Sequence, residues 1–310
     1  MSIDNLISCV KRKNNPTVVG LDPMLEYIPQ SVILPCFEKY GRNLKGAACA
    51  VLEFNKRLIN ALYMIIPCVK LQSAYYELYG FEGVAALRHT ADYARERGLY
   101  VILDGKRNDI GSTASAYARA YLGETSLLGG ESLAAFGADA LTVNPFLGSD
   151  GVLPFLSFGK AVFILLRTSN PSSYEIQNLR VEDVSTGNSK SFYLVLADYI
   201  SSWGSDSIGE NGFSNVGAVV GATHPAELAE LRRLMPDTFF LVPGYGAQGA
   251  GAADVSGAFN KDGLGAVINA SRSVMCAWKN DPRFGEDEFD EAAAVYAQKM
   301  RDDILAALQA

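Results

Sequence analysis

Short runs of apolar and β-branched residues recur along the whole chain, and polar residues or glycine close each of them. Runs of about four to eight such residues are typical of strands buried on both faces of a parallel sheet. The runs lie at residues 17–22, 67–72, 100–106, 140–144, 161–168, 216–223, 238–243 and 265–271. The pattern therefore predicts a parallel sheet built from these strands.

Between these runs, apolar residues recur with the spacing of one helix face. In residues 225–234, for example, Leu228, Leu231 and Leu234 repeat in this way. The predicted helices cover residues 47–65, 81–97, 112–136, 189–203, 225–234 and 289–308. Strands that alternate with helices in this number predict a (β/α)8 barrel, the TIM-barrel fold. An open doubly wound sheet is the alternative, but no G-x-G-x-x-G motif follows the first run.

We expect residues 1–310 to form a single barrel domain with two insertions, at about residues 23–45 and 170–215. Each insertion follows a predicted strand. Loops in that position lie on the catalytic face of this fold, so both insertions are expected there. A plain surface insertion is the alternative for each of them.

Charged residues directly follow the third apolar run, where residues 104–113 read D-G-K-R-N-D-I-G-S-T. Asp104 and Lys106 are two residues apart, so in a strand they share one face. Isolated charges are costly to bury, so the opposite charges of Asp104 and Lys106 either compensate each other or serve a function. Asp109 and Thr113 follow in what we expect to be a loop that opens a helix.

Polar side chains also stand at the carboxyl ends of the other predicted strands, where the catalytic residues of a barrel cluster. They are Asp22, Lys70, Asn144, Ser169, Asn170, Thr223, Gln248 and Arg272.

The loops after the last two strands carry a further signal. Residues 243–249 (P-G-Y-G-A-Q-G) are rich in glycine, and Arg272 follows the eighth strand. Glycine lets backbone N–H groups approach an anion, and a guanidinium binds its oxygens. Because these two loops form the usual phosphate site of the fold, the pattern predicts a phosphorylated ligand. An ordinary tight turn beside a surface arginine is the alternative.

Composition narrows the function further. A formal net charge of −7 argues against a nucleic-acid binder, which needs a basic face. No signal peptide or long uncharged apolar stretch is visible, so we expect a cytoplasmic protein that does not enter a membrane. The five cysteines form no C-x-x-C pair and are expected to be buried and reduced. The two histidines are far apart, which argues against a histidine-based zinc site, and we expect no metal and no cofactor.

Taken together, the motifs resemble the orotidine 5′-phosphate decarboxylase family, and their order and spacing resemble its longer type 2 branch. Besides residues 104–113, the resemblance rests on G-L-D-P at 20–23, V-K at 69–70, T-V-N-P at 142–145, R-T-S-N-P at 167–171, V-G-A-T at 220–223, P-G-Y-G-A-Q at 243–248 and N-A-S-R at 269–272. It implies a TIM barrel that converts orotidine 5′-monophosphate to uridine 5′-monophosphate and CO2 without a cofactor. This reaction is the last step of de novo UMP synthesis.

The resemblance also implies a catalytic group. Lys106 would donate a proton to C6 of the pyrimidine, Asp104 would lie beside the substrate carboxylate, and Lys70 would complete an alternating charge network. Asp109 and Thr113 would reach into the site of a second subunit, so the resemblance implies a homodimer with shared active sites.

Four further residues are implied to bind the substrate. Asp22 would bind a ribose hydroxyl, and Ser169 would contact the amide edge of the pyrimidine. Gln248 would link the pyrimidine to the phosphate, and Arg272 would bind the phosphate itself.

Three other functions are compatible with parts of this pattern. A metal-dependent phosphosugar lyase or synthase of the same barrel superfamily shares the D-x-K-x-x-D core. A non-catalytic sensor would bind a phosphorylated ligand in the barrel mouth, although simple binding does not require both Lys106 and Asp109. A Schiff-base aldolase would use Lys106 or Lys70.

Overall fold

Eight parallel strands close into a barrel in the order β1-β12-β11-β10-β7-β6-β3-β2. The structure, a computed structural model, describes residues 1–182, 184–246 and 249–309. The barrel strands are β1 (Thr17–Leu21), β2 (Cys68–Gln72), β3 (Tyr100–Arg107), β6 (Ala140–Val143), β7 (Ala161–Arg167), β10 (Val216–Val220), β11 (Phe240–Pro243) and β12 (Ala266–Ala270). Every predicted strand is present, and the predicted (β/α)8 barrel is confirmed.

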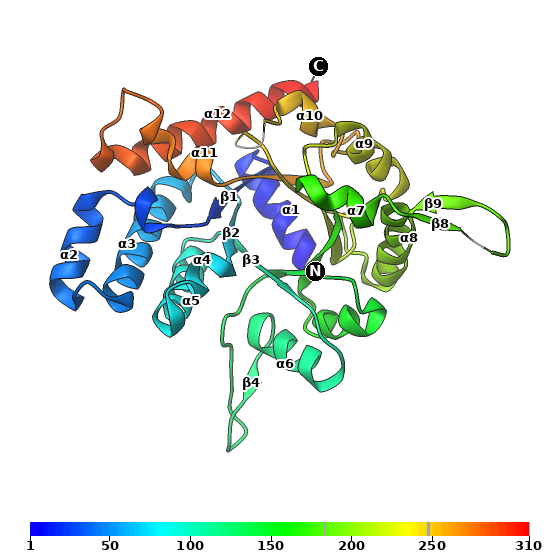
Figure 1. Ribbon diagram of the computed structural model, residues 1–310, viewed down its shortest axis with the longest axis horizontal. Coiled ribbons are helices and arrows are strands. Elements are labelled where there is room, and N and C mark those ends of the chain that lie inside the picture. The colour runs from blue at the N-terminus through cyan, green and yellow to red at the C-terminus, as the bar shows by residue number, and fades with distance from the viewer. Residues whose placement is uncertain (183, 247–248, 310) are drawn as a thin grey trace.

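Helices surround the barrel (Figure 1). The α-helices that the structure describes are α1 (Ser2–Lys13), α2 (Gln30–Tyr40), α3 (Leu44–Leu62), α4 (Ser73–Glu77), α5 (Gly80–Glu96), α6 (Gly111–Tyr121), α7 (Tyr174–Gln177), α8 (Phe192–Gly204), α9 (Pro225–Leu234), α10 (Ala252–Ser256), α11 (Arg272–Met275) and α12 (Phe289–Gln309). The predicted helices at 47–65, 81–97, 225–234 and 289–308 correspond to α3, α5, α9 and α12. None of the described helices has the length and apolar character needed to cross a bilayer.

Helix α1, which the sequence analysis did not predict, closes the amino end of the barrel. Its Ile3, Leu6 and Ile7 are fully buried and pack against side chains of the barrel strands. The Ser2 hydroxyl lies 2.9 Å from the Tyr100 hydroxyl at the start of β3, and the N–H of Ile3 donates to the side chain of Asn215 just before β10. Because α1 fills this end, only the carboxyl end of the barrel remains open.

The helix predicted over residues 112–136 is wrong in its second half. Helix α6 ends at Tyr121, and the chain then forms a projecting hairpin of β4 (Thr125–Ser126) and β5 (Ser132–Leu133) (Figure 1). Gly129 and Gly130 at its turn have positive φ angles of 98° and 89°, which L side chains rarely adopt. A turn that needs this backbone interrupts a helix, although the apolar residues around it suggested continuation.

The predicted helix at residues 189–203 begins later than expected. Residues 189–191 form β9 (Ser189–Ser191), which pairs with β8 (Arg180–Glu182) in an antiparallel hairpin, and α8 starts at Phe192. The insertion at residues 170–215 thus carries α7, this hairpin and α8. The insertion at residues 23–45 carries α2, which packs against α3.

The expectation that all five cysteines are reduced is wrong for two of them. Cys36 on α2 and Cys49 on α3 form a disulfide, with their Cα atoms 5.7 Å apart. Cys9, Cys68 and Cys276 are free. The two bonded cysteines are separated by 13 residues, and they meet because α2 and α3 pack side by side.

The packing of α12 on α3 leads to a stability prediction. Phe289 is fully buried, and its ring stacks on that of Phe54 with the centroids 4.8 Å apart. Phe289→Ala removes this contact and leaves a cavity, so we expect the free energy of unfolding to fall by about 3–5 kcal/mol in urea denaturation. Val295→Ala is the control, because Val295 lies on the same helix but is 40% exposed; a comparable loss in both variants would contradict the prediction.

Candidate active site

A cavity of about 1290 Å³ opens at the carboxyl ends of the barrel strands. Its walls combine charged and neutral polar groups from several strands with apolar residues from α8. Six of the residues implied to be catalytic or substrate-binding line it: Asp22, Lys70, Asp104, Lys106, Ser169 and Arg272. Asn144 and Asn170 also line this cavity, whereas Thr223 does not.

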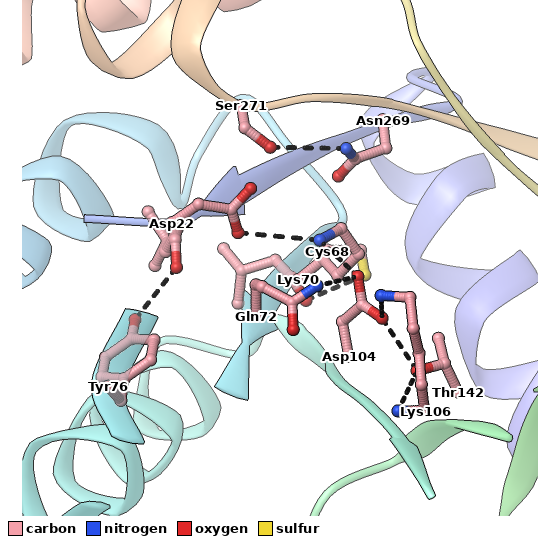
Figure 2. Close-up of polar contacts among 12 residues, drawn as sticks. Asp22, Cys68, Lys70, Gln72, Tyr76, Asp104, Lys106, Thr142, Asn269 and Ser271 are labelled. Carbon is pink, nitrogen blue, oxygen red and sulfur yellow. Dashed lines mark hydrogen bonds and ion pairs between the residues drawn. The ribbon is translucent and has the colours of Figure 1, made fainter. Parts of the chain in front are cut away.

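The carboxylate of Asp104 lies at the centre of the charged group and is 7% exposed (Figure 2). Its Oδ1 accepts hydrogen bonds from Lys106 Nζ at 2.6 Å and from Thr142 Oγ1 at 2.8 Å. Its Oδ2 accepts from Lys70 Nζ at 2.9 Å and from Gln72 Nε2 at 3.0 Å. A carboxylate has about four lone-pair positions, so the protein itself satisfies all of them.

Lys70 links Asp104 to a second carboxylate. Its ammonium is buried and lies 2.9 Å from Asp104 Oδ2 and 3.6 Å from Asp22 Oδ1. Charges therefore alternate in sign along Asp22, Lys70, Asp104 and Lys106 (Figure 2). This alternation is what allows so many ionised groups to share one partly desolvated site.

The pKa values of the two buried groups follow from this arrangement. Burial by itself lowers the pKa of Lys70, but the carboxylates of Asp104 and Asp22 outweigh burial and raise it above its ordinary value. Burial by itself raises the pKa of Asp104, but the ammonium groups of Lys70 and Lys106 hold it well below its ordinary value. Both groups are therefore charged over the whole physiological pH range.

The backbone at Lys106 has an uncommon conformation. Its φ angle is +46°, a region that residues other than glycine rarely occupy. The N–H of Lys106 donates to Thr142 Oγ1 at 2.9 Å, so the same threonine holds both the Asp104 carboxylate and the Lys106 backbone. With 44% of its side chain exposed, Lys106 presents its ammonium to the cavity. Backbone strain held in this way is frequent where a catalytic group must be placed.

The phosphate end of the predicted site is formed by β12 and the segment after it. Arg272 is exposed and lines the cavity together with Gly244 and Tyr245, which follow β11. Gly20 on β1 allows the close approach of Ser271, because a Cβ at Gly20 would lie 2.0 Å from Ser271 Oγ. Gln248, the proposed link between pyrimidine and phosphate, lies outside the described residues.

Asp109 and Thr113 do not join this group within one chain. Asp109 lies before α6 and Thr113 is exposed in the first turn of that helix. Neither residue lines the cavity.

Gln72 and Thr142 contact Asp104, and neither residue was proposed for the site from the sequence. Both donate to Asp104, so they complete its hydrogen bonding. A signal for Gln72 was present, because it is two residues from Lys70 in β2 and therefore shares its face. Thr142 carried a similar signal, because it is two residues before Asn144, but its contact with Asp104 also depends on how β3 and β6 align in the sheet.

Comparisons with known proteins assign the chain to a family. A sequence model of the orotidine 5′-phosphate decarboxylase / HUMPS family matches residues 18–283. The chain belongs to this family. An orotidine 5′-phosphate decarboxylase of Caldicellulosiruptor bescii is 37% identical over 309 residues, which cover 98% of each chain. Another, from Rhodopirellula baltica, is 40% identical over 280 residues, covering 89% of this chain and 88% of the relative.

Solved structures agree with the family assignment. The OMP decarboxylase of Leishmania donovani superposes with a TM-score of 0.73 at 32% sequence identity, covering 100% of this chain and 99% of that one. A protein of Toxoplasma gondii described as a putative orotidine-monophosphate decarboxylase has a TM-score of 0.77 at 30% identity, covering 99% and 97% of the two chains.

Among the residues that the structure describes, no cluster of three or more histidine, cysteine, aspartate or glutamate side chains is placed to hold a metal ion. The donor chemistry at Asp104 is consistent with this, because lysine, glutamine and threonine donors already occupy its oxygens.

The charge network leads to a prediction on stability and pH. Asp104→Asn leaves Lys70 buried with only the more distant Asp22, so we expect the free energy of unfolding to fall by about 3–5 kcal/mol at pH 7. The folded pKa of Asp104 is depressed, so its contribution is present above its unfolded pKa of about 3.9 and is lost as the pH falls further. The raised pKa of Lys70 keeps its contribution intact up to about pH 10.

The loss should therefore be constant between about pH 5 and 9, as measured by urea denaturation at several pH values. Asp198→Asn is the control, because it breaks an exposed pair with Lys190 and should cost less than about 1 kcal/mol. An unchanged or raised stability of Asp104→Asn would show that the network does not stabilise the fold.

Proposed function

We propose that this chain catalyses the decarboxylation of orotidine 5′-phosphate to uridine 5′-phosphate and CO2, the last step of de novo UMP synthesis, without a cofactor. The observation that carries the proposal is the Asp104 carboxylate at the open end of the barrel. All its hydrogen-bond acceptor positions are occupied, and it lies between the ammonium groups of Lys70 and Lys106. Membership in the decarboxylase family supports it.

The proposed reaction breaks the bond between C6 of the pyrimidine and the substrate carboxylate. The electron pair stays on C6 while CO2 leaves, and a proton from Lys106 Nζ then forms the new C6–H bond. The neutral amine of Lys106 regains its proton from water. A fixed ammonium beside C6 stabilises the developing negative charge, and the same group then serves as general acid.

Asp104 has two roles in this proposal. It holds Lys106 charged and in place through the 2.6 Å contact between Oδ1 and Nζ. Its negative charge would also lie beside the substrate carboxylate and disfavour the bound ground state relative to the transition state. Because its pKa is held low, Asp104 stays ionised and can perform both roles.

The remaining cavity residues are proposed to bind the substrate. Asp22, held near Lys70, would bind a ribose hydroxyl, and Ser169 would contact the pyrimidine. Arg272 would bind the phosphate at the far end. Gln248, outside the described residues, would link the pyrimidine to the phosphate. Binding energy from the phosphate can then be used to hold the pyrimidine against the charge network.

A phosphosugar lyase that binds a metal through Asp104 is less favoured. Such a metal would have to displace at least one of the four donors that Asp104 already accepts. A Schiff-base aldolase needs a neutral lysine, and the raised pKa of Lys70 opposes this.

We further propose that the active unit is a homodimer whose sites are shared. The position of Asp109 and Thr113 outside the cavity of their own chain is what supports this arrangement. Asp109 of one chain would lie near Lys106 of the other and continue the alternation of charge. We also propose that the chain forms one domain and acts in the cytoplasm.

Replacing the proton donor tests the reaction. Lys106→Ala should lower kcat for orotidine 5′-phosphate by at least about 100-fold, because it removes the proposed proton donor while the ammonium of Lys70 stays buried between Asp104 and Asp22. The fold should persist, since Lys70 still pairs with Asp104 and the Lys106 side chain is half exposed. Turnover is followed by the loss of substrate absorbance. Lys299→Ala is the control, because Lys299 forms an exposed pair with Asp303; near-normal turnover by Lys106→Ala would remove its assigned role.

Mixing two inactive variants tests the shared site. Lys106→Ala and Asp109→Ala are unfolded and refolded together, and random pairing makes about half of the dimers hybrid. In each hybrid dimer, one site lacks both groups and the other retains both. Roughly a quarter of the wild-type activity should therefore return. If Asp109 acted within its own chain, every site would stay broken and no activity would reappear.

A further inference from the structure

A chain of hydrogen bonds with a fixed direction runs from buried Arg167 to the rim of the cavity. Arg167 is the last residue of β7 and is 2% exposed. Its guanidinium pairs with Glu227 on α9 and also donates to Ser173 Oγ at 3.1 Å. An arginine can only donate hydrogen bonds, so every group that it contacts must accept.

Gln177, at the end of α7, is oriented by this rule. Its Oε1 accepts from Arg167 Nη1 at 3.2 Å and from the N–H of Thr168 at 3.0 Å. Two donors on one atom identify that atom as the amide oxygen, so the amide nitrogen must point the other way. Gln177 Nε2 donates to Thr168 Oγ1 at 2.7 Å.

The same direction continues to Asn170. Since the Thr168 hydroxyl accepts from Gln177, its own hydrogen is free to be donated, and it goes to Asn170 Oδ1 at 2.6 Å. The backbone carbonyl of Asn170 accepts from the N–H of Ser173, which holds this turn in place. The oxygen of the Asn170 side chain is thus engaged, and its Nδ2 makes no hydrogen bond to any residue in the described part of the chain.

Asn170 lines the cavity and is exposed to it, directly beside Ser169. We propose that Asn170 is a specificity-determining residue that presents its Nδ2 as a hydrogen-bond donor to a carbonyl oxygen of the pyrimidine, and that Gln177 is the positioning residue that sets this polarity. The inference rests on the proposed function for the identity of the ligand. The pyrimidine ring carries two carbonyl acceptors on either side of an N3–H donor, so the Nδ2 donor of Asn170 matches a carbonyl, whereas an inverted amide would match only the N3–H.

The test compares two competitive inhibitors of orotidine 5′-phosphate turnover. UMP contains the pyrimidine, and ribose 5-phosphate contains only the sugar and phosphate. In Asn170→Ala, the inhibition constant for UMP should rise roughly five- to fifty-fold, as expected for a lost hydrogen bond, while that for ribose 5-phosphate should change by less than about two-fold. Asn170→Asp turns the donor into an acceptor and should raise the UMP constant further. Asn178→Asp, an exposed neighbour outside the cavity, is the control for the added charge.

A second variant tests the positioning role. Gln177→Glu keeps both acceptor contacts with Arg167 and Thr168 N but cannot donate to Thr168 Oγ1. The Thr168 hydroxyl can then donate to residue 177, so Asn170 loses its fixed orientation. The inhibition constant for UMP should therefore rise, as in Asn170→Ala. Combined with Asn170→Ala, Gln177→Glu should add little, because both act through one donor. If Gln177 had a purely structural role, Gln177→Glu would instead weaken the binding of both inhibitors, and its effect would add to that of Asn170→Ala.

The outcomes separate this inference from the proposed function. If the wild type does not turn over orotidine 5′-phosphate, the proposed function fails. If it does, but Asn170→Ala binds UMP normally, the role of Asn170 is overturned. An equal loss of UMP and ribose 5-phosphate binding would also overturn it, since the contact would then be to sugar or phosphate.

Discussion

The carboxylate of Asp104 can be buried only because four donors reach it at once. Two of them are charged, Lys70 and Lys106, and two are neutral, Gln72 and Thr142. Removing a buried donor such as Lys70 would leave a lone pair of the 7% exposed Asp104 carboxylate without a protein partner. The donors come from three adjacent strands, β2, β3 and β6, so the site exists only when these strands pair in the observed register. The charge of Asp104 is therefore compensated only when these barrel strands are correctly paired.

The rest of the barrel is organised around an open and a closed end. Helix α1 fills the amino end with Ile3, Leu6 and Ile7, so the polar groups at the carboxyl end are the ones in contact with solvent and ligand. The strained backbone of Lys106 is held by Thr142, which also binds Asp104. The position of the proposed proton donor thus depends on the same threonine as the charge beside it.

Neutral groups at the rim are ordered in a different way. Around Asp104, the alternation of charge keeps each group ionised. At the end of β7, Arg167 sets the direction of the hydrogen bonds, and Gln177 and Thr168 continue it. Arg167 can set this direction because it has no acceptor. The result is a cavity with a charged centre and a rim whose donors and acceptors are fixed before a ligand enters.

The sequence alone determined the barrel and most of its proposed site. Apolar runs and helical spacing are local properties, so they predicted the eight barrel strands and helices α3, α5, α9 and α12. The position of polar residues after strands is also local, and it brought out Asp22, Lys70, Asp104, Lys106, Ser169 and Arg272, which all line one cavity.

Only the tertiary structure decided which partners these residues meet. The roles of Gln72 and Thr142 depend on strand register, the Cys36–Cys49 bond depends on the packing of two helices, and the orientation of Asn170 depends on an arginine that pairs with α9. The hairpin after α6 was missed because the apolar residues around its glycines also fit a helix. Local periodicity reports which face of an element is buried, but it does not report which distant element covers that face.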